Sequence, residues 1–140
     1  GESLLLRLDL VKNHDVIERA YNDSRDVNAR FNKNILNVVN NVTGSDFNPE
    51  QFEHLAFYNA DKHRIEMHLK AKKDMIISLN SGTDKIKIDK GEAIHTENSH
   101  KFTPDKIRTI GFWGGLDVEN VFTDEDQLFS LVQYRKNGSL

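Results

Sequence analysis

The spacing of apolar residues changes after residue 50, and this change constrains the fold more than any other feature of the sequence. Between residues 27 and 42, apolar side chains recur mostly every three or four positions, which predicts an amphipathic helix. From residue 56 to residue 88, apolar and polar residues alternate instead, as they do in antiparallel strands with one solvated face. The sequence therefore predicts an α+β fold in which helices accompany an antiparallel sheet. The helical stripe consists of Val27, Phe31, Ile35, Val38, Val39 and Val42.

Turn and capping residues place the other elements of the first half. Residues 4–10 form a nearly continuous apolar run, which predicts a strand covered on both faces. Residues 14–21 predict a short helix. Ser24 is the expected N-cap of the long helix, and Gly44 is expected to end it. Asn48, which a proline follows, is expected to cap a third, short helix.

A helix followed by two strands is predicted near the end of the chain. Thr103 precedes a proline and an aspartate, a combination typical of a helix start, and a pair of glycines is expected to end this helix. We expect Ile107, Ile110 and Phe112 to face a core. The two predicted strands and a polar tail without regular structure span residues 118–122, 128–134 and 135–140.

The charge balance and the absence of cysteine narrow the possible functions. A net charge of -3 gives no overall electrostatic reason to expect nucleic acid or an anionic membrane as partner. No stretch approaches the roughly 20 apolar residues of a membrane span. Without cysteine the chain can form no disulfide and no thiolate site, which fits a cytoplasmic protein. Because a core strand is predicted within three residues of Gly1, we expect the chain to be either an excised part of a longer protein or a designed one.

The six histidines do not predict a metal site. None of them forms a pair at the HExxH spacing. His95 and His100 bracket Glu97, a grouping that could suggest zinc, but a structural or surface role is favoured for each histidine. We therefore predict no bound metal.

The polar segment of residues 94–102 links the predicted sheet to the last helix. Glu97 and Ser99 lie two positions apart, so in an extended chain both side chains point to one side. A carboxylate and a hydroxyl that converge there could bind a small polar ligand. On periodicity alone, a solvated loop is the favoured interpretation.

Seven short motifs occur in the same order as in a known enzyme family. Together they resemble the histidine-specific Nα-methyltransferases of ergothioneine biosynthesis, and the resemblance runs from about Leu4 to about Tyr134. The motifs are Asp9-Leu10-Val11-Lys12, Ala20-Tyr21-Asn22-Asp23, Arg30-Phe31-Asn32-Lys33-Asn34, Asp46-Phe47, Phe52-Glu53-His54, Arg64-Ile65-Glu66-Met67, and Gly91-Glu92 with Thr96-Glu97-Asn98-Ser99-His100-Lys101-Phe102.

The resemblance implies a domain organisation and a cofactor. Residues 12–101 would form a substrate-binding domain of helices and antiparallel sheet. Residues 1–11 and 102–140 would supply the last strands and helix of a Rossmann-like methyltransferase domain. The cofactor would be S-adenosylmethionine (SAM), whose glycine-rich loop belongs to a part of the family that this sequence lacks. We therefore expect the chain alone to be inactive and assign no cofactor-binding residue.

The resemblance also implies a substrate site. Glu97 and Ser99 would hold the imidazole of histidine, and Met67 would line the same pocket. Tyr21 would orient the amino-acid head group and assist proton loss as the catalytic residue. The residue near Asn28 departs from the family's commoner threonine or small residue, so the substrate is predicted as histidine or a related amino acid.

Phe31 and Asn32 belong to the same helical region as Asn28 and could border this pocket, although core packing is the favoured interpretation for Phe31. Two other functions stay open. The chain could be a non-catalytic, regulatory module that binds histidine or another imidazole. It could also be completed by a second chain or by a missing N-terminal half, or associate with itself through an exposed sheet remnant.

Overall fold

The structure, a computed structural model, describes residues 2–22 and 25–136. The fold is α+β, with antiparallel strands and helices, as the spacing of apolar residues predicts. The chain divides into two compact units. Unit 1 comprises Gly1–His14, Ala60–Arg64 and His100–Leu140, and unit 2 comprises Asp15–Asn59 and Ile65–Ser99. Within the described residues, no helix is long and apolar enough to cross a membrane.

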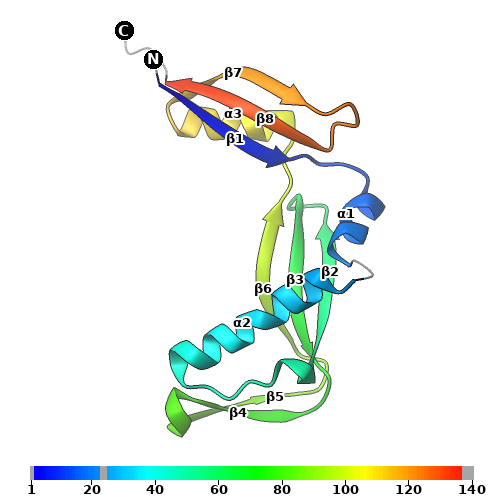
Figure 1. The fold of residues 1–140 in the computed structure, drawn as a ribbon, viewed down its shortest axis with the longest axis vertical. Helices are drawn as coiled ribbons and strands as arrows, with labels where there is room; N and C mark the ends of the chain where they lie inside the picture. Colours follow the sequence, from blue (N-terminus) through cyan, green and yellow to red (C-terminus); the bar gives the residue numbers. More distant parts are fainter. Residues whose placement is uncertain (1, 23–24, 137–140) are drawn as a thin grey trace. The chain divides into compact units, whose positions relative to one another are not determined.

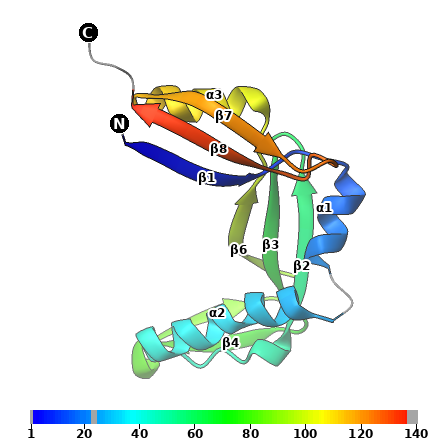
Figure 2. The ribbon, with the colours of Figure 1, turned by 45° about the horizontal axis from the view of Figure 1, so that its top comes forward.

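Unit 1 is a three-stranded antiparallel sheet with one helix (Figures 1 and 2). Its strand order is β1-β8-β7, so the first strand of the chain pairs with the last, in a register that sets Ser3 opposite Arg135. Leu8, Ile107, Val132 and Tyr134 form its buried core. The elements are β1 (Ser3–Asp9), α3 (Pro104–Trp113), β7 (Leu116–Thr123) and β8 (Phe129–Lys136).

The predicted elements of unit 1 are present, with three corrections. Helix α3 begins at the expected cap, where the Thr103 side chain accepts a hydrogen bond from the Lys106 amide. The expectation that residues 4–10 are covered on both faces is wrong, because Leu5 is 55% exposed and Leu8 alone in this strand is buried. Phe112 is also exposed rather than in the core. The tail expected to be irregular begins later, since Lys136 still belongs to β8.

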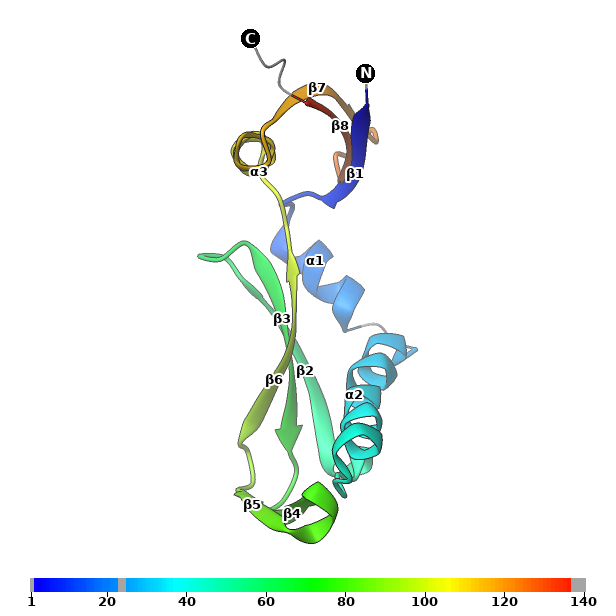
Figure 3. The same cartoon turned by 90° about the vertical axis from the view of Figure 1, so that its left-hand side faces the viewer.

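Unit 2 places two helices on one face of a second three-stranded sheet, of order β2-β3-β6 (Figure 3). Strands β4 and β5 pair separately as a hairpin. One core cluster joins Leu36 of the long helix to Phe52 and Leu69 of the sheet, and a second surrounds Ile17 of the short helix. The elements are α1 (His14–Tyr21), α2 (Val27–Thr43), η1 (Pro49–Gln51), β2 (Phe52–Asn59), β3 (Arg64–Ala71), β4 (Met75–Leu79), η2 (Asn80–Gly82), β5 (Asp84–Ile88) and β6 (Ala93–His100).

Helix α2 has the predicted length but not the predicted buried face. Its buried residues are Asn32 and Leu36, whereas Phe31 of the apolar stripe is 65% exposed, so core packing of Phe31 is wrong. The helix ends at Gly44 as expected, with φ at +64° and the Gly44 amide bonded to the Asn40 carbonyl. The expected N-cap, Ser24, lies outside the described residues.

Two short polar segments complete unit 2, and one of them has the expected structure while the other does not. Asn48 caps a 3-10 helix as expected, because its side chain accepts a hydrogen bond from the Glu50 amide at 3.0 Å. Most of the polar segment 94–102, for which a loop is the favoured interpretation, is strand β6, and that interpretation is wrong. This strand forms an edge of the sheet beside β3.

Candidate functional site

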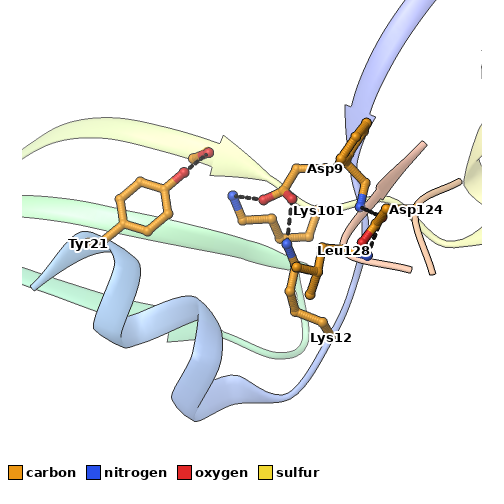
Figure 4. A network of polar contacts seen from close by, with 8 residues as sticks. Asp9, Lys12, Tyr21, Lys101, Asp124 and Leu128 are labelled. Carbon is orange, nitrogen blue, oxygen red and sulfur yellow. Dashed lines mark hydrogen bonds and ion pairs between the residues drawn. The ribbon is translucent and has the colours of Figure 1, made fainter. Parts of the chain in front are cut away.

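Tyr21 and Ser99 form a direct contact between helix α1 and strand β6. The two hydroxyl oxygens are 2.6 Å apart (Figure 4). Tyr21 is the last residue of α1, so its ring can reach down onto the sheet. The sequence separates these residues by 78 positions, and the fold joins them within unit 2.

Met67 lies in the apolar cluster against which Tyr21 packs. This cluster contains Ile17, Ala56, Ile65 and Met67, and Met67 is only 2% exposed. Three of the four predicted site residues, Tyr21, Met67 and Ser99, therefore belong to one region. A thioether beside an aromatic ring gives this region an adaptable apolar wall.

Asn32 links helix α2 to all three strands of the sheet. Its amide nitrogen donates to the His68 carbonyl at 3.1 Å and to Nδ1 of His54 at 3.0 Å. Its amide oxygen accepts from the Thr96 hydroxyl at 2.5 Å. The Thr96 hydroxyl is also 2.9 Å from the Met67 carbonyl. Asn32 is 3% exposed, so these contacts satisfy a buried amide that would otherwise destabilise the fold.

His54 continues this network to Tyr21. Because the amide nitrogen of Asn32 can only donate, Nδ1 of His54 accepts and its Nε2–H donates to the Tyr21 carbonyl, at 3.1 Å. The neutral tautomer of His54 thereby connects Asn32 to the end of helix α1. The backbone that carries the Tyr21 ring is held from the sheet side.

Glu97 lies beside Thr96 at the mouth of a small cavity. This cavity has a volume of about 200 Å³. Glu97 is exposed, whereas Ser99 is half-buried at Tyr21, so the two side chains do not share one environment. Thr96 and Ser99 are three positions apart, so in a regular strand their side chains would lie on opposite faces. Both nevertheless bond to groups on helices, which means that the side chains of β6 do not alternate strictly here. The cavity is lined by Phe31, Asn32, Asn34, Ile35, Val38, Thr96 and Glu97.

A larger cavity of about 610 Å³ lies where the end of α1 and the start of α2 meet strand β2. This volume is in the range of small-molecule pockets. Its lining includes Tyr21 and His54 together with the charged side chains of Arg30, Lys33 and Glu53. Oppositely charged groups around one cavity suit a ligand that carries both a cation and an anion.

A partly buried ion network in unit 1 joins the end of β1 to the segment before α3 (Figure 4). The Asp9 carboxylate is 2.8 Å from the ammonium of Lys101 and 2.6 Å from that of Lys12. Burial would raise the pKa of Asp9, but hydrogen bonds from Lys101 and Lys12 outweigh it and hold the pKa below its ordinary value. The Phe102 amide donates to the Asp9 carbonyl at 2.8 Å, so the two segments also share backbone hydrogen bonds.

Sequence reasoning proposed Tyr21, Met67, Glu97 and Ser99 as site residues but gave little attention to the residues that contact them. His54 and Thr96 carried no assigned role, and Asn32 was expected only to border the pocket. One sequence signal could have drawn attention to Asn32. It lies four positions before Leu36 and therefore on the same helix face as this apolar residue.

Comparison with known proteins adds a family to this geometry. A family model described as "Histidine-specific methyltransferase, SAM-dependent" matches residues 1–136. A histidine N-alpha-methyltransferase of Mycolicibacterium smegmatis is 38% identical over 131 residues, which cover 94% of this chain and 41% of that protein. The protein of the same name from Mycobacterium tuberculosis is 37% identical over the same shares of the two chains.

More distant similarity extends to enzymes with other names. An L-tryptophan methyltransferase of Psilocybe serbica is 28% identical over 141 residues, which cover 99% of this chain and 38% of that protein. The chain thus spans about two fifths of the length of these curated relatives.

Proposed function

Since this chain belongs to the family of SAM-dependent, histidine-specific methyltransferases, we propose that it is the substrate-binding portion of an enzyme that methylates the α-amine of histidine. The observation that carries the proposal is the contact between the Tyr21 and Ser99 hydroxyls, beside buried Met67. We include in the proposal a place in ergothioneine biosynthesis, on the resemblance of the seven sequence motifs.

The proposal assigns a different task to each unit. Residues 12–101 would form the substrate domain, and residues 1–11 and 102–140 a Rossmann-like part of the methyltransferase domain. The separation of the chain into two compact units with separate cores supports this division. The pairing of the first strand with the last supports it too, because the chain leaves and re-enters the same sheet.

Imidazole recognition follows from the chemistry of the proposed site residues. The Ser99 hydroxyl can donate and accept, so it can bond to an imidazole nitrogen in either tautomer. The Glu97 carboxylate accepts an imidazole N–H, a strong hydrogen bond because the acceptor is charged. A purely apolar amino acid would leave these polar groups without a partner, and the site would reject it.

Tyr21 is also the proposed catalytic residue. An α-amine has an ordinary pKa of about 8, so a fraction of it is already neutral near neutral pH. Nitrogen methylation then depends mainly on holding the amine lone pair in line, which orientation alone can accelerate strongly. Tyr21 would orient the amino-acid head group and, by accepting a hydrogen bond from the amine, assist the loss of its proton to solvent.

The family depends on SAM, which supplies the methyl group when bound. The residues of this chain do not fit the nucleotide part of that cofactor, because the sequence contains no glycine-rich GxGxxG turn after a strand. The residues that would hold the cofactor are therefore not assigned within this chain.

Histidine binding to the 140-residue chain tests the proposal. Isothermal titration calorimetry with L-histidine should give saturable binding that Glu97→Ala weakens about 10- to 100-fold, since hydrogen bonds to charged groups contribute about 1.5–3 kcal/mol. Glu125→Ala, which removes an exposed carboxylate in the turn between β7 and β8, is the matched control and should bind like the wild type. Equal binding by the Glu97→Ala variant would contradict the assignment of Glu97.

A further inference from the structure

Three potential metal ligands lie on one face of the β2-β3-β6 sheet. Glu66 and His68 are two positions apart on the central strand β3, so both point to the face opposite that of Met67. His95 lies on the neighbouring strand β6. Among the residues that the structure describes, each of these three offers one ligand atom within 4.8 Å of the other two.

One of these ligands is a buried residue, and a second has a buried ring nitrogen. Glu66 is 8% exposed, and one of its carboxylate oxygens accepts a hydrogen bond from the Asn59 amide at 3.0 Å. Nδ1 of His68 is buried and has no hydrogen-bond partner. Buried ring nitrogens normally have a partner, and one that lacks it calls for an explanation such as an ion.

The His68 ring is fixed between two other rings. It stacks on His95, with centroids 4.4 Å apart, and on Phe57, with centroids 5.3 Å apart. This stacking keeps the unpartnered Nδ1 of His68 on the face of the sheet that carries Glu66 and His95.

His95 has the outer hydrogen bonds that metal-binding histidines commonly make. Its Nε2 lies 2.9 Å from the Asn98 side-chain oxygen and 3.2 Å from the Glu97 carbonyl. Donation from Nε2–H to these oxygens fixes the tautomer and leaves the lone pair on Nδ1. The Asn59 side-chain amide likewise donates a hydrogen bond to the Glu66 carboxylate and so orients it.

We propose that Glu66, His68 and His95 form a binding site for a divalent transition-metal ion of the zinc type. Two imidazoles and one carboxylate form the donor set that zinc uses together with a fourth, exchangeable ligand. A tetrahedral ion with bonds of about 2.0–2.1 Å holds its ligand atoms about 3.4 Å apart, so these ligands must approach by roughly 1 Å.

The same movement must also turn the two rings. The planes of His68 and His95 are 18° from parallel, and an ion has to lie near both ring planes. His95 is exposed, so rotation about its side-chain torsions can bring its lone pair toward His68 and Glu66. The proposal does not depend on the proposed methyltransferase function, because it uses the opposite face of β3 from Met67.

Zinc titration of the 140-residue chain, free of any histidine tag, tests this site. Calorimetry with Zn²⁺ should show one ion bound per chain, and Co²⁺ in its place should give the visible absorption of a low-symmetry nitrogen and oxygen site. His95→Ala and Glu66→Gln should each weaken zinc binding at least about tenfold, because each removes one ligand. The affinity should also fall in acid, as protons compete for the two imidazoles.

His100→Ala is the matched control, since it removes another exposed histidine from the same strand and should leave zinc binding unchanged. Thermal melting of each variant separates loss of the site from loss of the fold. Because His95 is exposed, His95→Ala should melt like the wild type without metal. Absence of stoichiometric zinc binding, or the same affinity in the folded His95→Ala variant, would overturn the proposal.

Discussion

Lys101 keeps a buried positive charge because Asp9 lies beside it. The side chain of Lys101 is 1% exposed, whereas that of Asp9 is 40% exposed and also contacts Lys12. A buried charge whose partner is removed costs far more than the pair contributes in total. At the scale of single residues, this difference in exposure predicts that removing the charge of Asp9 destabilises the protein more than removing the charge of Lys101.

We predict that Asp9→Asn lowers the free energy of unfolding by about 2–4 kcal/mol, at the lower end of values for a broken buried pair because Asp9 is partly exposed. Lys101→Met, which removes the buried charge and keeps an apolar side chain of similar length, should cost clearly less. Urea unfolding of both variants at neutral pH checks this order. A larger loss in Lys101→Met than in Asp9→Asn would contradict it.

The same pair predicts a response to acid. The pKa of Asp9 is lowered in the folded state, so the Asp9 carboxylate stabilises the fold. This stabilisation is fully present above the ordinary aspartate pKa of about 3.9 and is lost as the pH falls through the lower pKa of the folded state. Unfolding measured from pH 6 down to pH 3 should therefore show the advantage of the wild type over Asp9→Asn shrinking below about pH 4.

At the scale of elements, the spacing of apolar residues located the helices and most strands, and the buried face of β3, but not the buried face of α2. In α2 the apolar stripe is mostly exposed, whereas the buried face carries Asn32, whose three polar contacts make an amide acceptable there. Hydrogen-bond partners that come from distant strands leave no mark on local periodicity. The pattern could therefore predict the helix but not its orientation.

Strand β6 was missed for a related reason. The residues from His95 to His100 are all polar, so no alternation marks them as a strand. Pairing with β3 fixes their conformation, and this pairing depends on the rest of the sheet. The spacing of Glu97 and Ser99 suggested a ligand pair, but only the order of the family motifs favoured this interpretation over a solvated loop.

Gly44 ends helix α2 at a position where a residue with a Cβ atom would be strained. Its φ is +64°, and an added Cβ would lie 2.5 Å from the Ser81 hydroxyl oxygen and 3.0 Å from the Ser81 amide nitrogen. We predict that Gly44→Ala lowers the free energy of unfolding by about 2–3 kcal/mol, since both the backbone and the contact are strained. Thermal or urea unfolding measures this loss.

Gly115 is the control for this prediction, because it has the same φ of +64° and no atom within 4 Å of an added Cβ. Gly115→Ala should cost only the backbone penalty, about 1 kcal/mol. Equal losses in the two variants would mean that the contact with Ser81 contributes nothing.

At the scale of the whole molecule, two units with separate cores divide the proposed work. Unit 2 contains Tyr21, Met67, Glu97 and Ser99, and unit 1 contains the ion network of Asp9 and Lys101. The chain spans about two fifths of its curated relatives, which include enzymes named for histidine and for tryptophan. The central claim is therefore the identity of the amino acid that unit 2 is proposed to bind.

Competition between L-histidine and L-tryptophan for the 140-residue chain tests that claim most directly. The carboxylate and hydroxyl proposed to bind the two imidazole nitrogens should favour histidine about a hundredfold, because an indole has a single N–H and leaves one of these groups without a partner, which costs up to about 3 kcal/mol. Displacement of labelled histidine by unlabelled histidine, with tryptophan ineffective at a hundredfold higher concentration, is the predicted result. Equal or tighter binding of tryptophan would contradict the assignment of histidine as substrate.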